Sequence, residues 1–223
     1  MKRKIFFLLV WIVSISAKAQ DNFSSGLLPG INVSIGLTDR FILSNKIESR
    51  QVILEKLSED MSYKFVLMDV SSVLSFRTSA NTRINGGYLI RIVDDRTLHR
   101  FIQQFNLVNN LDRMRLAHRF ALDQTIGKDL PMEFRTRYRI SLEKPLSGEK
   151  ADPKEFYLKL SNEYLWVVQN KNSDVEIRFI SLLGYTANTK NKIEAGFDYR
   201  FNEFLLSTSD HDLWINITWY VAL

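Results

Sequence analysis

The C-terminal stretch "LWINITWYVAL" (213–223) alternates between apolar side chains and a more mixed set. Successive side chains of a β-strand point to opposite faces, so one face of this stretch is apolar throughout. That face consists of Leu213, Ile215, Ile217, Trp219, Val221 and Leu223. Termini of soluble proteins are usually exposed and loosely held. In outer-membrane barrels, by contrast, the barrel-assembly machinery recognises a closing strand that ends in a hydrophobic residue. We therefore expect a membrane-insertion strand in contact with outer-membrane lipid.

A stretch in the middle of the chain, "MEFRTRYRIS" (132–141), places Arg135, Arg137 and Arg139 at every second position. As a strand it would carry a column of guanidinium groups on one face and largely apolar side chains on the other. Similar alternation recurs in 88–92, 156–166, 175–179 and 193–201. The pattern suits the apolar-out, polar-in strands of outer-membrane barrels. Taken one strand at a time, it equally fits a half-buried sheet of a soluble protein.

Strand-like segments separated by polar turns fill most of the chain. We count eleven of them: 31–37, 41–53, 70–79, 83–93, 97–108, 114–126, 132–146, 156–168, 175–187, 193–206 and 213–223. Most exceed the ~5–6 residues usual in soluble domains and match the ~9–11 that a tilted strand needs to cross a bilayer. No long amphipathic helix interrupts them. The fold predicted is all-β, an antiparallel transmembrane up-and-down β-barrel.

The expected strand number is ten or twelve, because bacterial barrels normally have an even count. One of the eleven segments must then be misjudged. Either 31–37 lies outside the barrel, or a further strand lies within 20–30 or 54–66.

Residues 1–19 have the layout of a secretory signal peptide. Three basic residues (2–4) precede an apolar run (5–13), and Ala17-Lys18-Ala19 supplies an A-x-A cleavage site. The apolar run is short for a membrane-spanning helix. We therefore expect cleavage after Ala19, a barrel formed by 20–223, and a location in the outer membrane of a Gram-negative cell.

Charge and cysteine content exclude several classes of protein. Residues 1–19 contain four basic residues and no acidic one, so their removal lowers the formal charge from +5 to +1. A nearly neutral chain gives little support to nucleic-acid binding. The absence of cysteine excludes a lipid-anchored lipoprotein, a disulfide framework and a thiolate metal site.

An ordered set of short motifs resembles a known family. The motifs are "NGGYLIR" (85–91), "HRFIQQF" (99–105), "RLAHRFALDQ" (115–124), "FRTRYRISLEKPL" (134–146), "LSNEYLW" (160–166) and "IRFISLLGY" (177–185). They resemble the DUF2490 family of uncharacterised Bacteroidetes-type outer-membrane proteins. That family often carries Asn-Arg in its ninth strand, whereas here Ile177 precedes Arg178, so only the arginine matches. The resemblance implies an outer-membrane barrel and no known activity.

Charged residues on the polar faces are expected to meet in the interior of the barrel. The predicted lumen charge network is Arg91, Arg100, Arg119, Glu133, Arg135, Arg137, Arg139, Glu163, Arg178, Glu194, Asp198 and Arg200. Lone charges in a narrow interior are costly, and guanidinium groups pair well with carboxylates. Small barrels have interiors barely wider than their side chains. We therefore favour a salt-bridged plug over an anion-attracting channel lining or ligand site.

Catalysis has weak support in the sequence. His99 and His118 fall on apolar faces, and His211 lies in a polar stretch that we interpret as a loop. A loop-borne hydrolase site could use Ser207, Ser209, Asp210, His211 and Asp212. Any solvated loop contains such residues, and there is no His/Glu metal spacing and no phosphate loop. We expect a non-enzymatic barrel without cofactor or metal; a surface enzyme acting on lipid or peptide and a soluble periplasmic barrel remain the alternatives.

Overall fold

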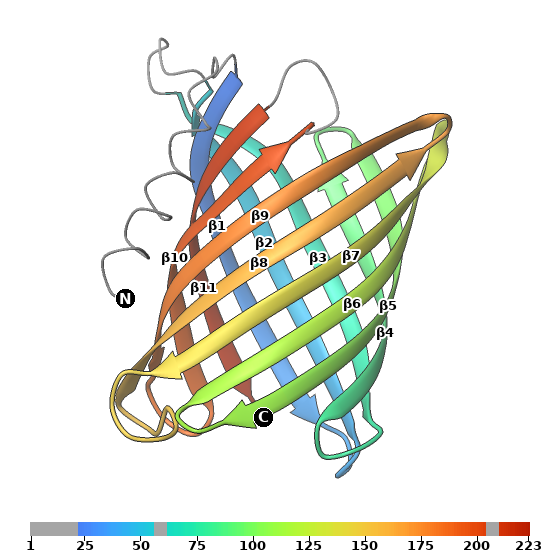
Figure 1. The fold of residues 1–223 in the computed structure, drawn as a ribbon. Coiled ribbons are helices and arrows are strands. Elements are labelled where there is room, and N and C mark those ends of the chain that lie inside the picture. Colours follow the sequence, from blue (N-terminus) through green and yellow to red (C-terminus); the bar gives the residue numbers. More distant parts are fainter. Residues whose placement is uncertain (1–21, 56–61, 204–209) are drawn as a thin grey trace, which may run out of the picture.

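The computed structural model describes residues 22–55, 62–203 and 210–223, and these residues form one closed barrel of eleven strands (Figure 1). The strands are β1 (Asn22–Gly36), β2 (Phe41–Leu54), β3 (Lys64–Arg77), β4 (Thr82–Val93), β5 (Arg96–Leu111), β6 (Met114–Gly127), β7 (Leu130–Pro145), β8 (Glu155–Gln169), β9 (Asn172–Thr186), β10 (Asn191–Asn202) and β11 (Asp210–Ala222). None of the described residues forms a helix long and apolar enough to cross a lipid bilayer.

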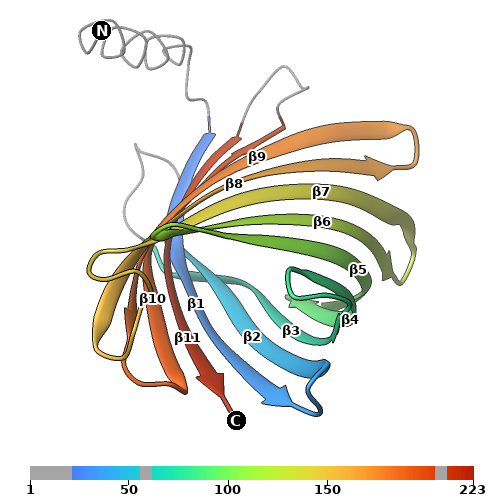
Figure 2. The same ribbon diagram turned by 60° about the horizontal axis from the view of Figure 1, so that its bottom comes forward.

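Each strand pairs antiparallel with the next strand along the chain, and the barrel closes between β1 and β11. This closing pair is parallel, with Leu28 opposite Asn216 and Ser34 opposite Ala222. Figure 2 shows β1 between β2 and β11. The expected count of ten or twelve strands is therefore wrong, and so is the expectation of antiparallel pairing throughout. The second error follows from the first, because strands that alternate in direction leave the first and last strand parallel when their number is odd.

All eleven segments read from the sequence correspond to strands of the barrel. The segment 31–37 belongs to the barrel, because β1 includes residues 31–36 and extends back to Asn22. The stretch 22–30 is the first part of that same strand, and β3 begins at Lys64. Residues 1–21, which include the expected signal peptide, and residues 56–61 lie outside the described part of the chain.

Tight polar turns join four of the described strand pairs. These two-residue turns are 94–95, 112–113, 128–129 and 170–171. One residue in each has a positive φ: Asp94 (47°), Arg113 (58°), Asp129 (58°) and Asn170 (57°). Asp and Asn tolerate this left-handed conformation better than most residues, which suits three of the four turn positions; Arg113 is the exception.

The two faces of the wall differ sharply in polarity. In the β10–β11 pair, Phe197 lies opposite Ile215 on the outer face, and their exposed fractions are 56% and 44%. The next pair, Asp198 and Trp214, points inward and is 3% and 4% exposed. Every strand contributes at least one exposed large apolar side chain to the outer face. The inner face combines apolar side chains such as Leu28 and Trp214 with the polar and charged groups that line most of the cavity.

The C-terminal strand follows the face pattern read from the sequence. Leu213, Ile215, Ile217, Trp219 and Val221 alternate along β11 with the inward residues Trp214, Asn216, Thr218 and Tyr220. Leu223 lies one residue beyond β11, and its backbone N–H donates to the carbonyl oxygen of Ser34 at 2.9 Å. The end of the chain is thus bonded to β1.

Candidate functional site

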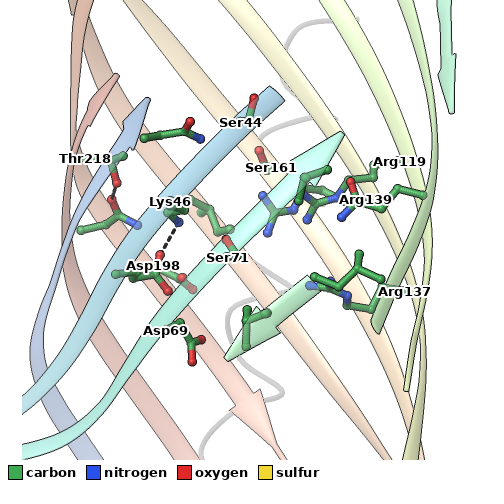
Figure 3. A pocket seen from close by; sticks show the side chains of 18 of the residues that line it. Ser44, Lys46, Asp69, Ser71, Arg119, Arg137, Arg139, Ser161, Asp198 and Thr218 are labelled. Atoms are coloured by element: carbon green, nitrogen blue, oxygen red, sulfur yellow. Dashed lines mark hydrogen bonds and ion pairs between the residues drawn. The ribbon is translucent and has the colours of Figure 1, made fainter. Parts of the chain in front are cut away.

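A polar cavity of about 380 Å³ lies inside the barrel, and Figure 3 shows side chains that line it. In that view Arg119, Arg137 and Arg139 extend into the interior from one wall, and Lys46 and Asp198 lie on the other side. Among the described residues, eleven lysines and arginines line this cavity, against four acidic residues. The cations are Lys46, Arg50, Arg91, Arg100, Arg119, Arg135, Arg137, Arg139, Lys159, Arg178 and Arg200.

Glu163 on β8 is the centre of the largest cluster of charges. Its side chain has no solvent exposure. Arg119 on β6 donates to its Oε1 at 2.9 Å, and Arg139 on β7 donates to its Oε2 at 2.7 Å. Arg178 on β9 and Arg137 on β7 approach the same carboxylate at 3.5 and 3.9 Å. One buried carboxylate therefore connects four adjacent strands.

Further ion pairs extend this network around the wall on the β3–β7 side. Arg91 forms a two-pronged pair with Asp69, at 2.7 Å from Nε and 2.6 Å from Nη2. Arg137 lies 2.8 Å from the buried Asp123. Arg135 pairs with Glu133 on the same side, at 2.5 Å.

The opposite side of the interior contains pairs of the same kind. Arg200 pairs with Asp198 at 2.8 Å, and both side chains are almost fully buried. Two more cations pair with carboxylates two residues away on their own strands, Lys46 with Glu48 and Arg178 with Glu176. Charge-assisted pairs of this type are among the stronger polar contacts in proteins.

Glu194 receives three donors. Lys159 Nζ lies 2.9 and 3.0 Å from its two carboxylate oxygens. The hydroxyl groups of Tyr157 and Tyr220 donate to it at 2.9 and 3.1 Å. Tyr157 reaches this position because its ring occupies the space over Gly184, where a Cβ would lie 2.1 Å from the ring.

Two cavity arginines have no carboxylate within ion-pairing distance in the part of the chain that the structure describes. Arg100 is 4% exposed; its Nε donates to Thr125 at 2.9 Å, and its buried Nη2 has no partner there. Arg50 lies over the ring of Trp214, with 5.9 Å from Cζ to the ring centroid. Its buried Nε also lacks a hydrogen-bond acceptor among the described residues.

All twelve residues of the lumen network named from the sequence lie in ion pairs or line this cavity. Sequence reasoning missed Lys46, Glu48, Arg50, Asp69 and Lys159. The alternation of Lys46, Glu48 and Arg50 in β2 was a usable signal. Asp69 could not be found in this way, because its role depends on the register that places it opposite Arg91.

The histidines pair with tyrosines. Tyr88 Oη lies 2.5 Å from His99 Nδ1, and the corresponding distance between Tyr138 and His118 is 2.9 Å. The interpretation of His211 as a loop residue is wrong, because β11 begins at Asp210 and so includes it. Its Nδ1 lies 2.5 Å from the hydroxyl oxygen of Tyr199.

Of the other residues in the suggested hydrolase site, some lie in the barrel and some lie outside the described residues. Asp212 accepts hydrogen bonds from Ser24 and from Asn202, the latter at 2.8 Å. Ser207 and Ser209 lie outside the described residues. Within the described part of the chain, no three His, Cys, Asp or Glu side chains are grouped to hold a metal ion.

Comparison with known families gives one match. The model of a family described as "Protein of unknown function (DUF2490)" matches residues 30–206. The chain belongs to the DUF2490 family. The match includes every lysine and arginine that lines the cavity of this DUF2490 barrel. No similar curated protein and no similar solved structure was found.

Proposed function

We propose that this DUF2490 protein is an outer-membrane β-barrel of non-enzymatic function whose interior is a salt-bridged plug. The observation that carries the proposal is the opposition of the two faces: large apolar side chains outside and paired charges inside.

The outer face supports a lipid environment. Phe197, Phe179 and Trp166 are each more than half exposed, and comparable side chains occur on every strand. Monomeric soluble proteins rarely expose contiguous apolar surface beyond a few hundred Å². A bilayer would cover such a band, as it does in outer-membrane barrels. In this proposal the protein reaches the outer membrane through its signal peptide and is inserted by the barrel-assembly machinery.

The interior supports a plug because most of its charged side chains are held in ion pairs, some within a strand and some across strands. Glu163 alone connects β6, β7, β8 and β9. Burying a charge is costly unless it is paired, so each of these contacts offsets desolvation and ties the wall together. Side chains held in this way leave a cavity rather than a wide pore.

Planar-bilayer recording of the refolded protein tests the proposal. We expect the protein to insert and to show no steady conductance. The control is Arg96→Ala, a substitution in a turn-proximal side chain that is 63% exposed. A wild-type current with anion preference that Arg137→Ala reduces and Arg96→Ala leaves unchanged would overturn the plug in favour of a channel. Failure of the folded protein to associate with lipid would overturn the membrane assignment, and turnover of a lipid or peptide would overturn the non-enzymatic one.

A further inference from the structure

The cations that line the cavity outnumber the carboxylates that line it or pair with these cations. Besides the four carboxylates that line the cavity, four more pair with its arginines: Asp123, Glu133, Glu163 and Glu176. These eight acids face eleven cations in the described part of the chain. After each carboxylate is assigned one cation, three of the eleven cations have no carboxylate of their own, and an anion in the cavity would offset their mutual repulsion.

The excess charge includes Arg50 and Arg100. Each has a buried guanidinium nitrogen without an acceptor among the described residues, and neither has a carboxylate partner there. Buried donors of native proteins are almost always satisfied by a protein group, a water or a ligand, so Arg50 and Arg100 offer donors to whatever occupies the cavity. Arg91 lies on β4, between the strands of these two arginines, and its charge acts on both.

More spare donors border the same cavity. The Nε atoms of Arg119, Arg137 and Arg139 are also buried without an acceptor in the described part of the structure. The cavity of about 380 Å³ has room for a small ion with several waters, since a water takes up about 30 Å³. The neighbouring carboxylates, Glu48, Asp69 and Asp123, are each held by a cation of their own.

We infer that the cavity binds a small multivalent oxyanion with the chemistry of inorganic phosphate, for which Arg50 and Arg100 are the principal ligands. Guanidinium groups recognise phosphate oxygens through parallel N–H donors, and an anion with two or more charges neutralises more of the excess than chloride does. The inference goes beyond the proposed plug. It does not depend on which solvent surrounds the barrel, because every group involved faces the interior.

Isothermal titration of the folded, detergent-solubilised protein with inorganic phosphate tests this inference. We expect the wild type to bind phosphate saturably. Arg50→Gln and Arg100→Gln should each weaken the affinity about tenfold or more, because each removes a charged hydrogen bond. Arg96→Gln is the matched control, since Arg96 lies on the same strand as Arg100 and is 63% exposed. Its affinity should equal that of the wild type, and chloride should bind more weakly than phosphate.

Thermal unfolding provides a second measurement, which uses the wild-type protein alone and therefore does not depend on whether the variants fold. Phosphate should raise the melting temperature of the wild-type barrel, because a ligand that binds only the folded state stabilises it. Absence of saturable phosphate binding by the folded wild type, or equal binding by Arg100→Gln, overturns the inference. Lipid association of the same preparation separates the two proposals. Phosphate binding without insertion into lipid would contradict the membrane assignment alone, and insertion into lipid without phosphate binding would contradict the anion site alone.

Discussion

Glu163 shows at the scale of one residue why this interior needs its carboxylates. Its side chain is fully buried, and Arg119 and Arg139 donate to its two oxygens. Removing one partner of a buried ion pair leaves the other charge without compensation, which costs more than the pair itself contributes. The arginines around Glu163 would then repel one another at close range.

We therefore predict that Glu163→Gln destabilises the barrel by about 3–5 kcal/mol. The change keeps the shape of the side chain and removes its charge. Urea unfolding of the protein folded in vesicles measures the difference. Glu149→Gln in the exposed loop between β7 and β8 is the control and should change little. Equal stability of Glu163→Gln and the wild type would show that the cluster around Glu163 contributes no net stability.

For single residues, the sequence indicated on which face of its strand each charged side chain lies, but not which residue it pairs with. The alternation around Arg135, Arg137 and Arg139 was sufficient to turn them inward. The convergence of arginines from three strands on Glu163 depends on the register of β6 to β9, which no local pattern contains. The excess of cations was likewise invisible, because it emerges only when every pair has been assigned.

At the scale of the element, the closing pair of strands decides the architecture. The sequence suggested eleven strands, and the rule of even numbers argued against that count. The predicted first strand was shorter than β1, because Pro29 and two glycines interrupt the alternation of apolar and polar residues before residue 31. Proline has no N–H for a sheet ladder, so such a stretch reads as a turn.

We predict that a disulfide forms between β1 and β11 when Ser34→Cys and Ala222→Cys are combined. The two residues are partners in the parallel register, and the chain has no other cysteine. A disulfide requires Cα atoms closer than about 7 Å. Gel mobility before and after reduction measures the cross-link.

The control for this experiment combines Ser34→Cys with Asp210→Cys. These positions lie at opposite ends of the parallel pair and should not cross-link. Efficient cross-linking of the control, with none between 34 and 222, would contradict the parallel closure.

At the scale of the whole molecule, the proposed barrel wall has lipid on its outer side and charged groups on its inner side. Phe197 lies in the middle of β10 on the outer face, whereas Leu37 lies in the turn after β1. Their exposed fractions are similar, 56% and 53%. Only their expected depth in the membrane differs.

We predict that Phe197→Arg destabilises the barrel folded in vesicles by about 2–4 kcal/mol, while Leu37→Arg destabilises it by about 0–1 kcal/mol. Arginine is costly near the middle of a bilayer and tolerated close to its surface. Denaturant titration in vesicles measures both. Equal effects of the two substitutions would indicate that water, not lipid, surrounds β10.

Quenching of tryptophan fluorescence by lipids with brominated acyl chains shows directly whether lipid contacts the outer face of the barrel. Variants that retain only Trp166 or only Trp214 report on the two faces, because Trp166 is 55% exposed and Trp214 is 4% exposed. We predict that brominated lipid quenches Trp166 strongly and Trp214 weakly, and that aqueous iodide leaves Trp166 nearly unquenched. Strong iodide quenching of Trp166 without quenching by brominated lipid would contradict the account.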